Sequence, residues 1–105
     1  MTRGEIWWPE LAGEAGFRPV VVVSCAEGAV GRKNVIVAEV TRAVRCLPCE
    51  VPLSIADGMP TECVVKTDNL HPIPRDRLWQ TITTLSPEKV FALGGALRYS
   101  LDLEG

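Results

Sequence analysis

The sequence predicts a mainly β (α+β) fold, a small antiparallel β-barrel followed by one C-terminal helix. Short runs of β-branched residues alternate with turn-forming glycine, proline and asparagine, which is the pattern of short strands joined by tight connections. The strongest helix signal begins at residue 86, near the end of the chain. A chain of 105 residues has room for one hydrophobic core. Residues 1–105 are therefore predicted to form a single domain, about six strands of SH3-like size.

Composition narrows the class of protein. The chain is 47% hydrophobic and 23% charged, as in ordinary globular proteins, and its net charge is −2. Loose binding to nucleic acid requires clustered positive charge, so any such binding must use a local basic groove. The apolar runs are too short for a membrane span, and no apolar segment follows the first five residues as in a signal peptide. We expect a soluble cytoplasmic protein.

The first two strands are expected at residues 4–11 and at about 17–25. Pro9 favours an edge or a bulge in the first strand, where Trp7 and Trp8 face opposite sides. The second strand contains Val20 to Val23, an unbroken apolar run typical of a strand buried on both faces. Pro19 biases Arg18 towards extended backbone, so a permanent cation stands at the entrance of this buried strand.

The later strands are shorter or less regular. Residues 26–33 read as a loop, and residues 34–41 as a third strand that is antiparallel to the second. Strands are also predicted at 50–53, 61–67 and 80–85, with a helical turn at 75–79. Pro72 and Pro74 exclude a helix in the segment at residues 69–74 that follows the strand at 61–67.

The C-terminal helix has a complete start signal. Ser86 is a good N-cap, Pro87 suits the first helical position and Glu88 places an acid in the first turn. An apolar stripe follows, formed by Val90, Leu93, Leu97 and Leu101. Gly94-Gly95 costs about 1 kcal/mol per glycine inside a helix, so the pair marks a kink or a close approach to another element.

Four cysteines raise the question of a metal or redox site. Cys46 and Cys49 have CxxC spacing, but the remaining Cys25 and Cys63 and the single His71 do not supply a second ligand pair. No metal site is predicted. In the cytosol these cysteines are expected to stay reduced and to pack as small apolar residues. A Cys46–Cys49 disulfide under oxidation is the alternative.

Antiparallel pairing predicts one polar juxtaposition. The start of the second strand and the end of the third lie at the same end of the sheet, so Arg18 and Thr41 can be neighbours. A forked guanidinium and a hydroxyl together suit an anion such as phosphate. The plainer interpretation is a surface ion pair for Arg18 and an ordinary strand position for Thr41. Residue types alone leave both open.

Four segments, in this order and spacing, resemble the MazF/PemK family of toxin endoribonucleases: Arg3 to Trp7, Gly16 to Ser24, Val35 to Thr41 and Glu62 to Ile73. The resemblance implies the toxin of a type II toxin–antitoxin system, a cytoplasmic homodimer of SH3-like barrels with a cognate antitoxin. It also implies sequence-specific cleavage of single-stranded RNA (mRNA), without a metal or other cofactor, by attack of the RNA 2′-hydroxyl.

The resemblance further implies the site residues. Arg18 and Thr41 correspond to the family's catalytic pair, with Arg18 acting as acid or base and stabilising charge on the phosphate. The expected RNA-binding residues are Glu14, Phe17, Ser24, Arg42, Asn69 and His71. Two segments depart from the family pattern, namely the shortened loop at residues 13–16 and Asn69-Leu70-His71 where Gln-Ile-Arg is common.

Two other functions fit a barrel of this size. A CcdB-like toxin directed at gyrase shares the fold but typically ends in Trp-Gly-Ile, whereas this chain ends in Leu103-Glu104-Gly105. A catalytically inactive SH3-like binding module is the second alternative. It predicts that replacing Arg18 changes at most stability.

Overall fold

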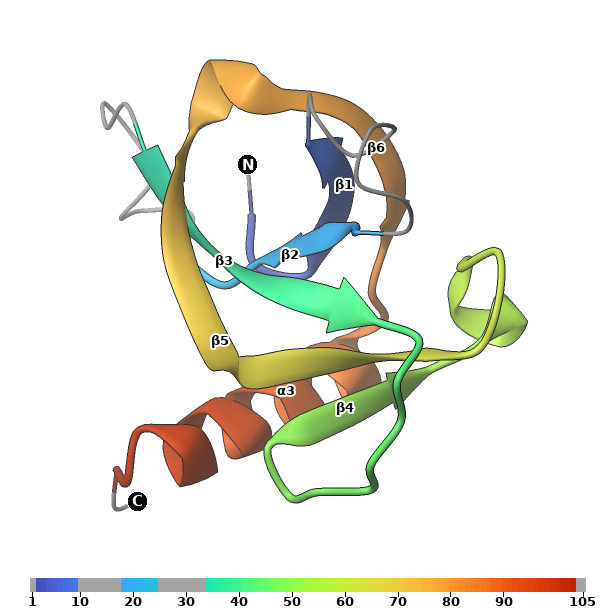
Figure 1. Ribbon diagram of the computed structural model, residues 1–105, viewed down its shortest axis with the longest axis vertical. Coiled ribbons are helices and arrows are strands. Elements are labelled where there is room, and N and C mark those ends of the chain that lie inside the picture. Colours follow the sequence, from blue (N-terminus) through green and yellow to red (C-terminus); the bar gives the residue numbers. More distant parts are fainter. Residues whose placement is uncertain (1, 10–17, 25–33, 104–105) are drawn as a thin grey trace.

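The computed structural model describes residues 2–9, 18–24 and 34–103 (Figure 1). In these ranges it contains six strands, two short 3-10 turns and one α-helix. The strands are β1 (Glu5–Pro9), β2 (Val20–Val22), β3 (Asn34–Thr41), β4 (Glu50–Leu53), β5 (Cys63–Pro74) and β6 (Leu78–Thr84). The turns are η1 (Ile55–Asp57) and η2 (Arg75–Arg77), and the helix is α3 (Pro87–Ser100).

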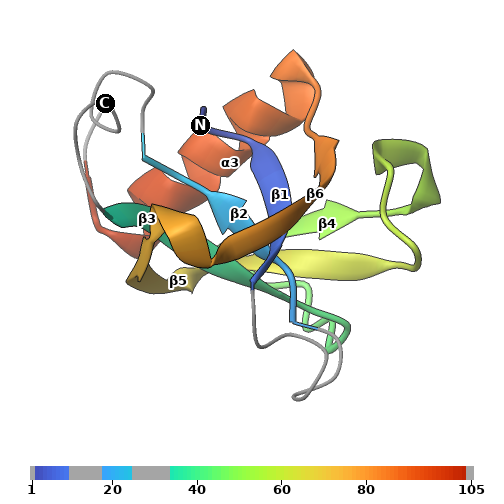
Figure 2. The same cartoon turned by 90° about the horizontal axis from the view of Figure 1, so that it is seen from above.

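All six strands form one antiparallel sheet in the order β4-β5-β3-β2-β1-β6. The sheet curls strongly, and α3 packs beside β4 and β5 (Figures 1 and 2). The predicted mainly β fold with a C-terminal helix is confirmed. The curled sheet stays open in the described part of the chain, because its order ends at β4 and β6.

The valine run of β2 is buried on both faces, as predicted. Val21 and Val23 join a large cluster that includes Ile6, Val40 and Leu93 of the helix. The opposite face carries a second cluster, formed by Val20, Val22, Val35, Val37 and Leu78, with Trp7 and Ile73 packed against it. Alternate side chains of a strand point to opposite faces, so one continuous apolar run supplies both clusters.

A register shift bends β5 in its middle. Ala38 of β3 pairs with Leu70, whereas the next residue, Glu39, pairs with Lys66. Three residues of β5 therefore lie between two adjacent positions of β3. One of them, Thr67, is fully buried, and its hydroxyl is 2.6 Å from the Cys49 carbonyl oxygen and 3.2 Å from that of Ala96. The bulge thus joins the sheet to α3.

The second half of β5 extends the predicted strand at 61–67 as far as Pro74. Pro72 and Pro74 exclude a helix there, as predicted, but they lie opposite Ile36 and Asn34 of β3. β4 pairs with residues 63–66 only, so this half of β5 is an edge. An edge tolerates proline because its missing N–H can face away from the partner strand. The predicted helical turn is η2, and β6 begins earlier than predicted, at Leu78.

The start of α3 is as predicted: the Ser86 hydroxyl accepts a hydrogen bond from the Lys89 N–H at 3.3 Å. Leu93, Ala96 and Leu97 are buried. The predicted fourth stripe residue, Leu101, follows the helix and is exposed, because the helix ends at Ser100. α3 and the other helices of the described ranges are too short to cross a membrane.

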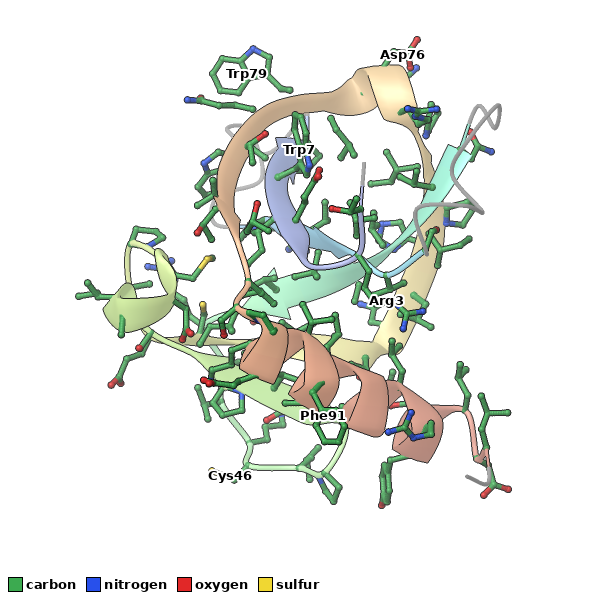
Figure 3. All side chains as sticks on the ribbon, turned by 180° about the vertical axis from the view of Figure 1, so that it is seen from behind. Arg3, Trp7, Cys46, Asp76, Trp79 and Phe91 are labelled. Carbon is green, nitrogen blue, oxygen red and sulfur yellow. The ribbon has the colours of Figure 1, made fainter. Side chains whose placement is uncertain are left out.

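The glycine pair of α3 has open surroundings within the described chain. A Cβ added at Gly95 would meet nothing within 4 Å, and one at Gly94 would meet only the Arg98 side chain at 3.8 Å. The predicted close approach is therefore not to another described element of this protomer. Phe91 and Tyr99, one turn before and after Gly95, are exposed, and Phe91 lies on the outer face of α3 (Figure 3).

Candidate active site

The register of β2 and β3 brings Arg18 level with Thr41. Val20 pairs with Glu39 and Val21 with Ala38, and the Val40 N–H donates to the Pro19 carbonyl at 2.9 Å. Continuing this antiparallel ladder by two residues places Arg18 opposite Thr41. The register therefore brings the two residues to the same end of the sheet, as the sequence predicted.

Both residues also lie on one face of the sheet. Arg18 continues the alternation of Val20 and Val22, and Thr41 continues that of Val35 and Val37. These four valines belong to the second apolar cluster. The polar pair therefore lies at the end of a buried apolar cluster.

Arg18 forms an ion pair that leaves most of its side chain exposed. Its Nη1 is 3.8 Å from Oε1 of Glu39, and the Arg18 side chain is 61% exposed. An exposed pair of this kind contributes roughly 0–1 kcal/mol. A phosphate can therefore compete for the guanidinium at little cost, so the ion pair and an anion-binding role are compatible.

Thr41 closes β3 with a local turn. Its Oγ1 accepts a hydrogen bond from the Ala43 N–H at 3.2 Å, an arrangement that fixes the hydroxyl oxygen at the strand end. The hydroxyl hydrogen remains a donor in this arrangement, since the recorded bond uses only the oxygen as an acceptor. The chain then turns into the exposed Arg42.

Glu39 stands at the centre of the polar cluster, and the sequence interpretation did not include it. Its Oε2 accepts a hydrogen bond from Nδ2 of Asn69 at 2.8 Å and lies 4.0 Å from Nδ1 of His71. Its Oε1 faces Arg18. One signal could have identified it: Glu39 is a charged residue two positions before Thr41, hence on the same face.

Asn69 and His71 reach Glu39 because of the β5 bulge. His71 pairs with Val37 of β3, and Asn69 is one of the three β5 residues that lie within the register shift. Two residues of the predicted RNA-binding segment therefore lie next to the ion-pair partner of Arg18. The Leu70 side chain between them packs against the main core instead.

The structure separates Ser24 from this cluster. The Ser24 hydroxyl oxygen accepts a hydrogen bond from the Ile36 N–H at 2.7 Å and extends the ladder at the other end of β2. Six residues of extended chain correspond to roughly 20 Å. Ser24 thus supports the sheet in this protomer and lies far from Arg18. Glu14 and Phe17 lie outside the described residues.

The connection after Thr41 is organised by a buried carboxylate. Oε1 of Glu50 accepts hydrogen bonds from the Arg45 N–H at 3.0 Å and the Leu47 N–H at 3.4 Å. Oε2 of Glu50 has no hydrogen-bond partner among the described residues. Glu50 pairs across the sheet with Lys66, which also pairs with Glu39. Lys66 therefore links the connection, through Glu50, to Glu39 in the polar cluster.

The three cysteines within the described residues form no disulfide. Cys46 is exposed, Cys49 and Cys63 are buried, and all three have free thiols. Burial, with a smaller contribution from the Asp57 charge, raises the pKa of the Cys63 thiol to about 11. Within residues 2–9, 18–24 and 34–103, no group of three or more histidine, cysteine or acidic side chains is arranged to hold a metal ion.

The comparisons with known proteins converge on one family. A family model described as "PemK-like, MazF-like toxin of type II toxin-antitoxin system" matches residues 2–101. A probable endoribonuclease MazF2 from Mycobacterium tuberculosis is 37% identical over 101 residues, covering 95% of this chain and 97% of the relative. A probable endoribonuclease MazF5 from the same species is 34% identical over 102 residues, covering 95% and 92%.

A solved structure shares the fold. The Mycobacterium tuberculosis toxin MazF-mt6 has a TM-score of 0.84 and 31% sequence identity, covering 96% of this chain and 99% of that chain. The match therefore extends over the whole curled sheet and the C-terminal helix.

Proposed function

The chain belongs to the PemK/MazF family of type II toxin–antitoxin toxins and is an endoribonuclease of that family, and we propose that it cleaves single-stranded RNA through Arg18 and Thr41. The observation that supports this assignment of residues is the β2–β3 register, which brings a guanidinium and a hydroxyl to the same end and the same face of the sheet. Asn69 and His71 add further polar groups on the same face.

The proposed reaction uses the RNA as its own nucleophile. The 2′-oxygen attacks the adjacent phosphorus, a bond from the 2′-oxygen to phosphorus forms, and the bond from phosphorus to the 5′-oxygen breaks. Negative charge builds on the non-bridging oxygens, and Arg18 and Thr41 donate hydrogen bonds to them. An arginine stays protonated at neutral pH, which suits it to charge stabilisation. DNA lacks the 2′-hydroxyl and is not a substrate.

The test is cleavage of a long single-stranded RNA with EDTA present. Wild-type protein should cut at a short recurring sequence. Arg18→Ala and Thr41→Val should each reduce cleavage by about a hundredfold or more, because each removes a donor to the developing charge. Thr41→Val keeps the shape of the side chain, and Thr84→Val is a control at an exposed strand position. An RNA with one 2′-deoxynucleotide at the cut site should resist cleavage there.

Wild-type protein that leaves a broad set of RNAs intact would contradict the ribonuclease function and favour an inactive binding module. A CcdB-like action on gyrase is not favoured, since the matching family model and relatives are MazF-like. If both variants cut as well as wild-type protein, the assigned residues are wrong and the family function stands.

The proposed partners are a cognate antitoxin and a second copy of the chain. The family description itself places these toxins in toxin–antitoxin systems. The open surface at Gly95, between exposed Phe91 and Tyr99, supports a homodimer, since a helix or sheet of a second copy can approach closely there. Light scattering of the purified protein decides the oligomeric state. We also propose a cytoplasmic location and a reaction that needs no metal or other cofactor.

A further inference from the structure

We propose that Glu39 is the general base of the reaction, a role that rests on the proposed ribonuclease function. In this role its carboxylate takes the proton from the attacking 2′-hydroxyl, while Arg18 and Thr41 hold the phosphate. Asn69 is the positioning residue that holds the carboxylate in place.

Chemistry requires a group other than Arg18 for this step. A base must be able to accept a proton, and a guanidinium at neutral pH already carries its full complement of protons. A threonine hydroxyl is a very weak base. A carboxylate can accept a proton, and Glu39 provides one within 3.8 Å of Arg18.

The position of Glu39 fits a ribose beside the bound phosphate. Glu39 and Thr41 are two residues apart on one face of β3, a separation of about 7 Å along the strand. The Glu39 side chain is 29% exposed, so substrate can reach it, although most of the side chain is buried against other residues. A phosphate that replaces the ion pair at Arg18 frees Oε1 of Glu39 at the moment when the nucleophile arrives.

The hydrogen bond from Asn69 orients the base. Nδ2 of Asn69 donates to Oε2 at 2.8 Å, which leaves Oε1 as the oxygen directed towards Arg18. This hydrogen bond from the neighbouring strand β5 restricts the rotamers of Glu39, which would otherwise move freely. Catalytic groups are preorganised by contacts of this kind.

Among the described residues, the charged or titratable groups that face Glu39 come from β5 and from the segment just before β2. They are Arg18, Lys66, which pairs with Glu39 across the sheet, and His71. Arg18 and Lys66 are cations, so two of these three groups have the charge opposite to that of the carboxylate.

The proton balance closes without an added reagent. The 2′-hydroxyl proton moves to Glu39 as the bond from the 2′-oxygen to phosphorus forms, and the electron pair of the broken bond leaves with the 5′-oxygen. That oxygen takes a proton from water, and Glu39 releases its proton to water before the next turnover. The products are a 2′,3′-cyclic phosphate and a 5′-hydroxyl end.

The decisive variant is Glu39→Gln. Glutamine has nearly the same shape, and its amide oxygen can still accept the hydrogen bond from Asn69, but it cannot take up a proton at neutral pH. We expect kcat to fall by about a hundredfold to ten-thousandfold with KM little changed. Glu88→Gln is the matched control, because Glu88 is an exposed carboxylate on the first turn of α3.

The pH profile separates a base from a residue that only positions Arg18. For wild-type protein kcat/KM should depend on pH through the group that takes up the proton, and this dependence should be absent from the residual activity of Glu39→Gln. A wild-type pH profile that Glu39→Gln reproduces unchanged overturns the proposal, and Glu39→Asp, which keeps a carboxylate, is the second variant if Glu39→Gln fails to fold. Full activity of Glu39→Gln also overturns it.

The same cleavage assay distinguishes a wrong role for Glu39 from a wrong proposed function. If wild-type protein cuts RNA and Glu39→Gln cuts equally well, only the role of Glu39 is wrong. If wild-type protein cuts no RNA, the proposed function fails and the role of Glu39 fails with it.

Discussion

Asn69 donates a hydrogen bond to Glu39 over 2.8 Å although 30 residues separate the two in the chain. The contact exists because the bulge of β5 inserts extra residues beside Glu39. Asn69 thereby faces the ion-pair partner of Arg18, and its amide can be tested independently of Arg18 and Thr41.

Asn69→Asp should weaken RNA cleavage. The substitution places a carboxylate against the Glu39 carboxylate in place of a donor, so the hydrogen bond is lost and like charges repel. A hydrogen bond to a charged group contributes about 1.5–3 kcal/mol, which corresponds to roughly a tenfold to hundredfold loss in kcat/KM. Steady-state cleavage assays measure it. Asn34→Asp, at the exposed start of β3, is the control, and equal activity of the two variants would contradict the prediction.

Thr67→Val should destabilise the fold. The Thr67 hydroxyl bridges the Cys49 and Ala96 carbonyls and lies 2.5 Å from the Ser100 hydroxyl. Valine fits the space but leaves these polar groups without their partner. We expect a loss of about 1–3 kcal/mol in the free energy of unfolding, measured by urea denaturation. Thr84→Val, which is exposed, should stay within about 0.5 kcal/mol of wild-type protein.

Gly58→Ala and Gly95→Ala should shift stability in opposite directions. Gly58 has φ +95°, and an added Cβ would lie 2.5 Å from Oγ1 of Thr83, so alanine should cost about 1–3 kcal/mol. Gly95 lies inside α3 with open space around it, so alanine should stabilise the protomer by about 0.5–1 kcal/mol. A concentration-dependent loss of stability for Gly95→Ala would instead indicate that a partner packs on this surface.

Cys46 should react with iodoacetamide at pH 8 and Cys63 should not. Cys46 is exposed, whereas the Cys63 thiol is buried and its pKa is about 11, so it holds little thiolate at that pH. Peptide mass spectrometry after a timed pulse measures each site, and labelling in urea gives the reference for full reaction. Comparable labelling of both cysteines in the folded protein would show that the core around Cys63 opens readily.

Glu5 should make stability depend on pH. Burial raises the pKa of Glu5, but hydrogen bonds from Trp7 and Thr2 outweigh burial and lower the pKa below the ordinary value of a glutamate. A carboxyl whose pKa is lower in the folded state stabilises above its unfolded pKa, and this contribution is lost as pH falls through the folded pKa. Glu5→Gln should therefore lose stability at neutral pH and converge with wild-type protein in acid. Urea denaturation at several pH values tests this, with a substitution of the exposed Glu62, Glu62→Gln, as control.

Local chemistry determined a large part of the fold. Val20 to Val23 predicted a strand buried on both faces, since β-branched apolar side chains on both sides of a strand each need a core. Ser86 and Pro87 predicted the start of α3, because capping depends on residues adjacent in the chain. Antiparallel pairing of two neighbouring strands then predicted that Arg18 and Thr41 lie at one end of the sheet.

Tertiary structure alone decided where Glu39, Asn69 and His71 meet. Their contact depends on the bulge of β5, and that bulge is held by Thr67 through groups 18 and 29 residues away. No local sequence pattern predicts these partners, because both are backbone carbonyls, which every residue has. They become partners of Thr67 only when α3 and the 42–49 connection pack around it. The chain by itself therefore determined the strands and the position of Arg18 and Thr41 at one end of the sheet. The packing of α3 against the bent β5 decided which polar side chains lie near them.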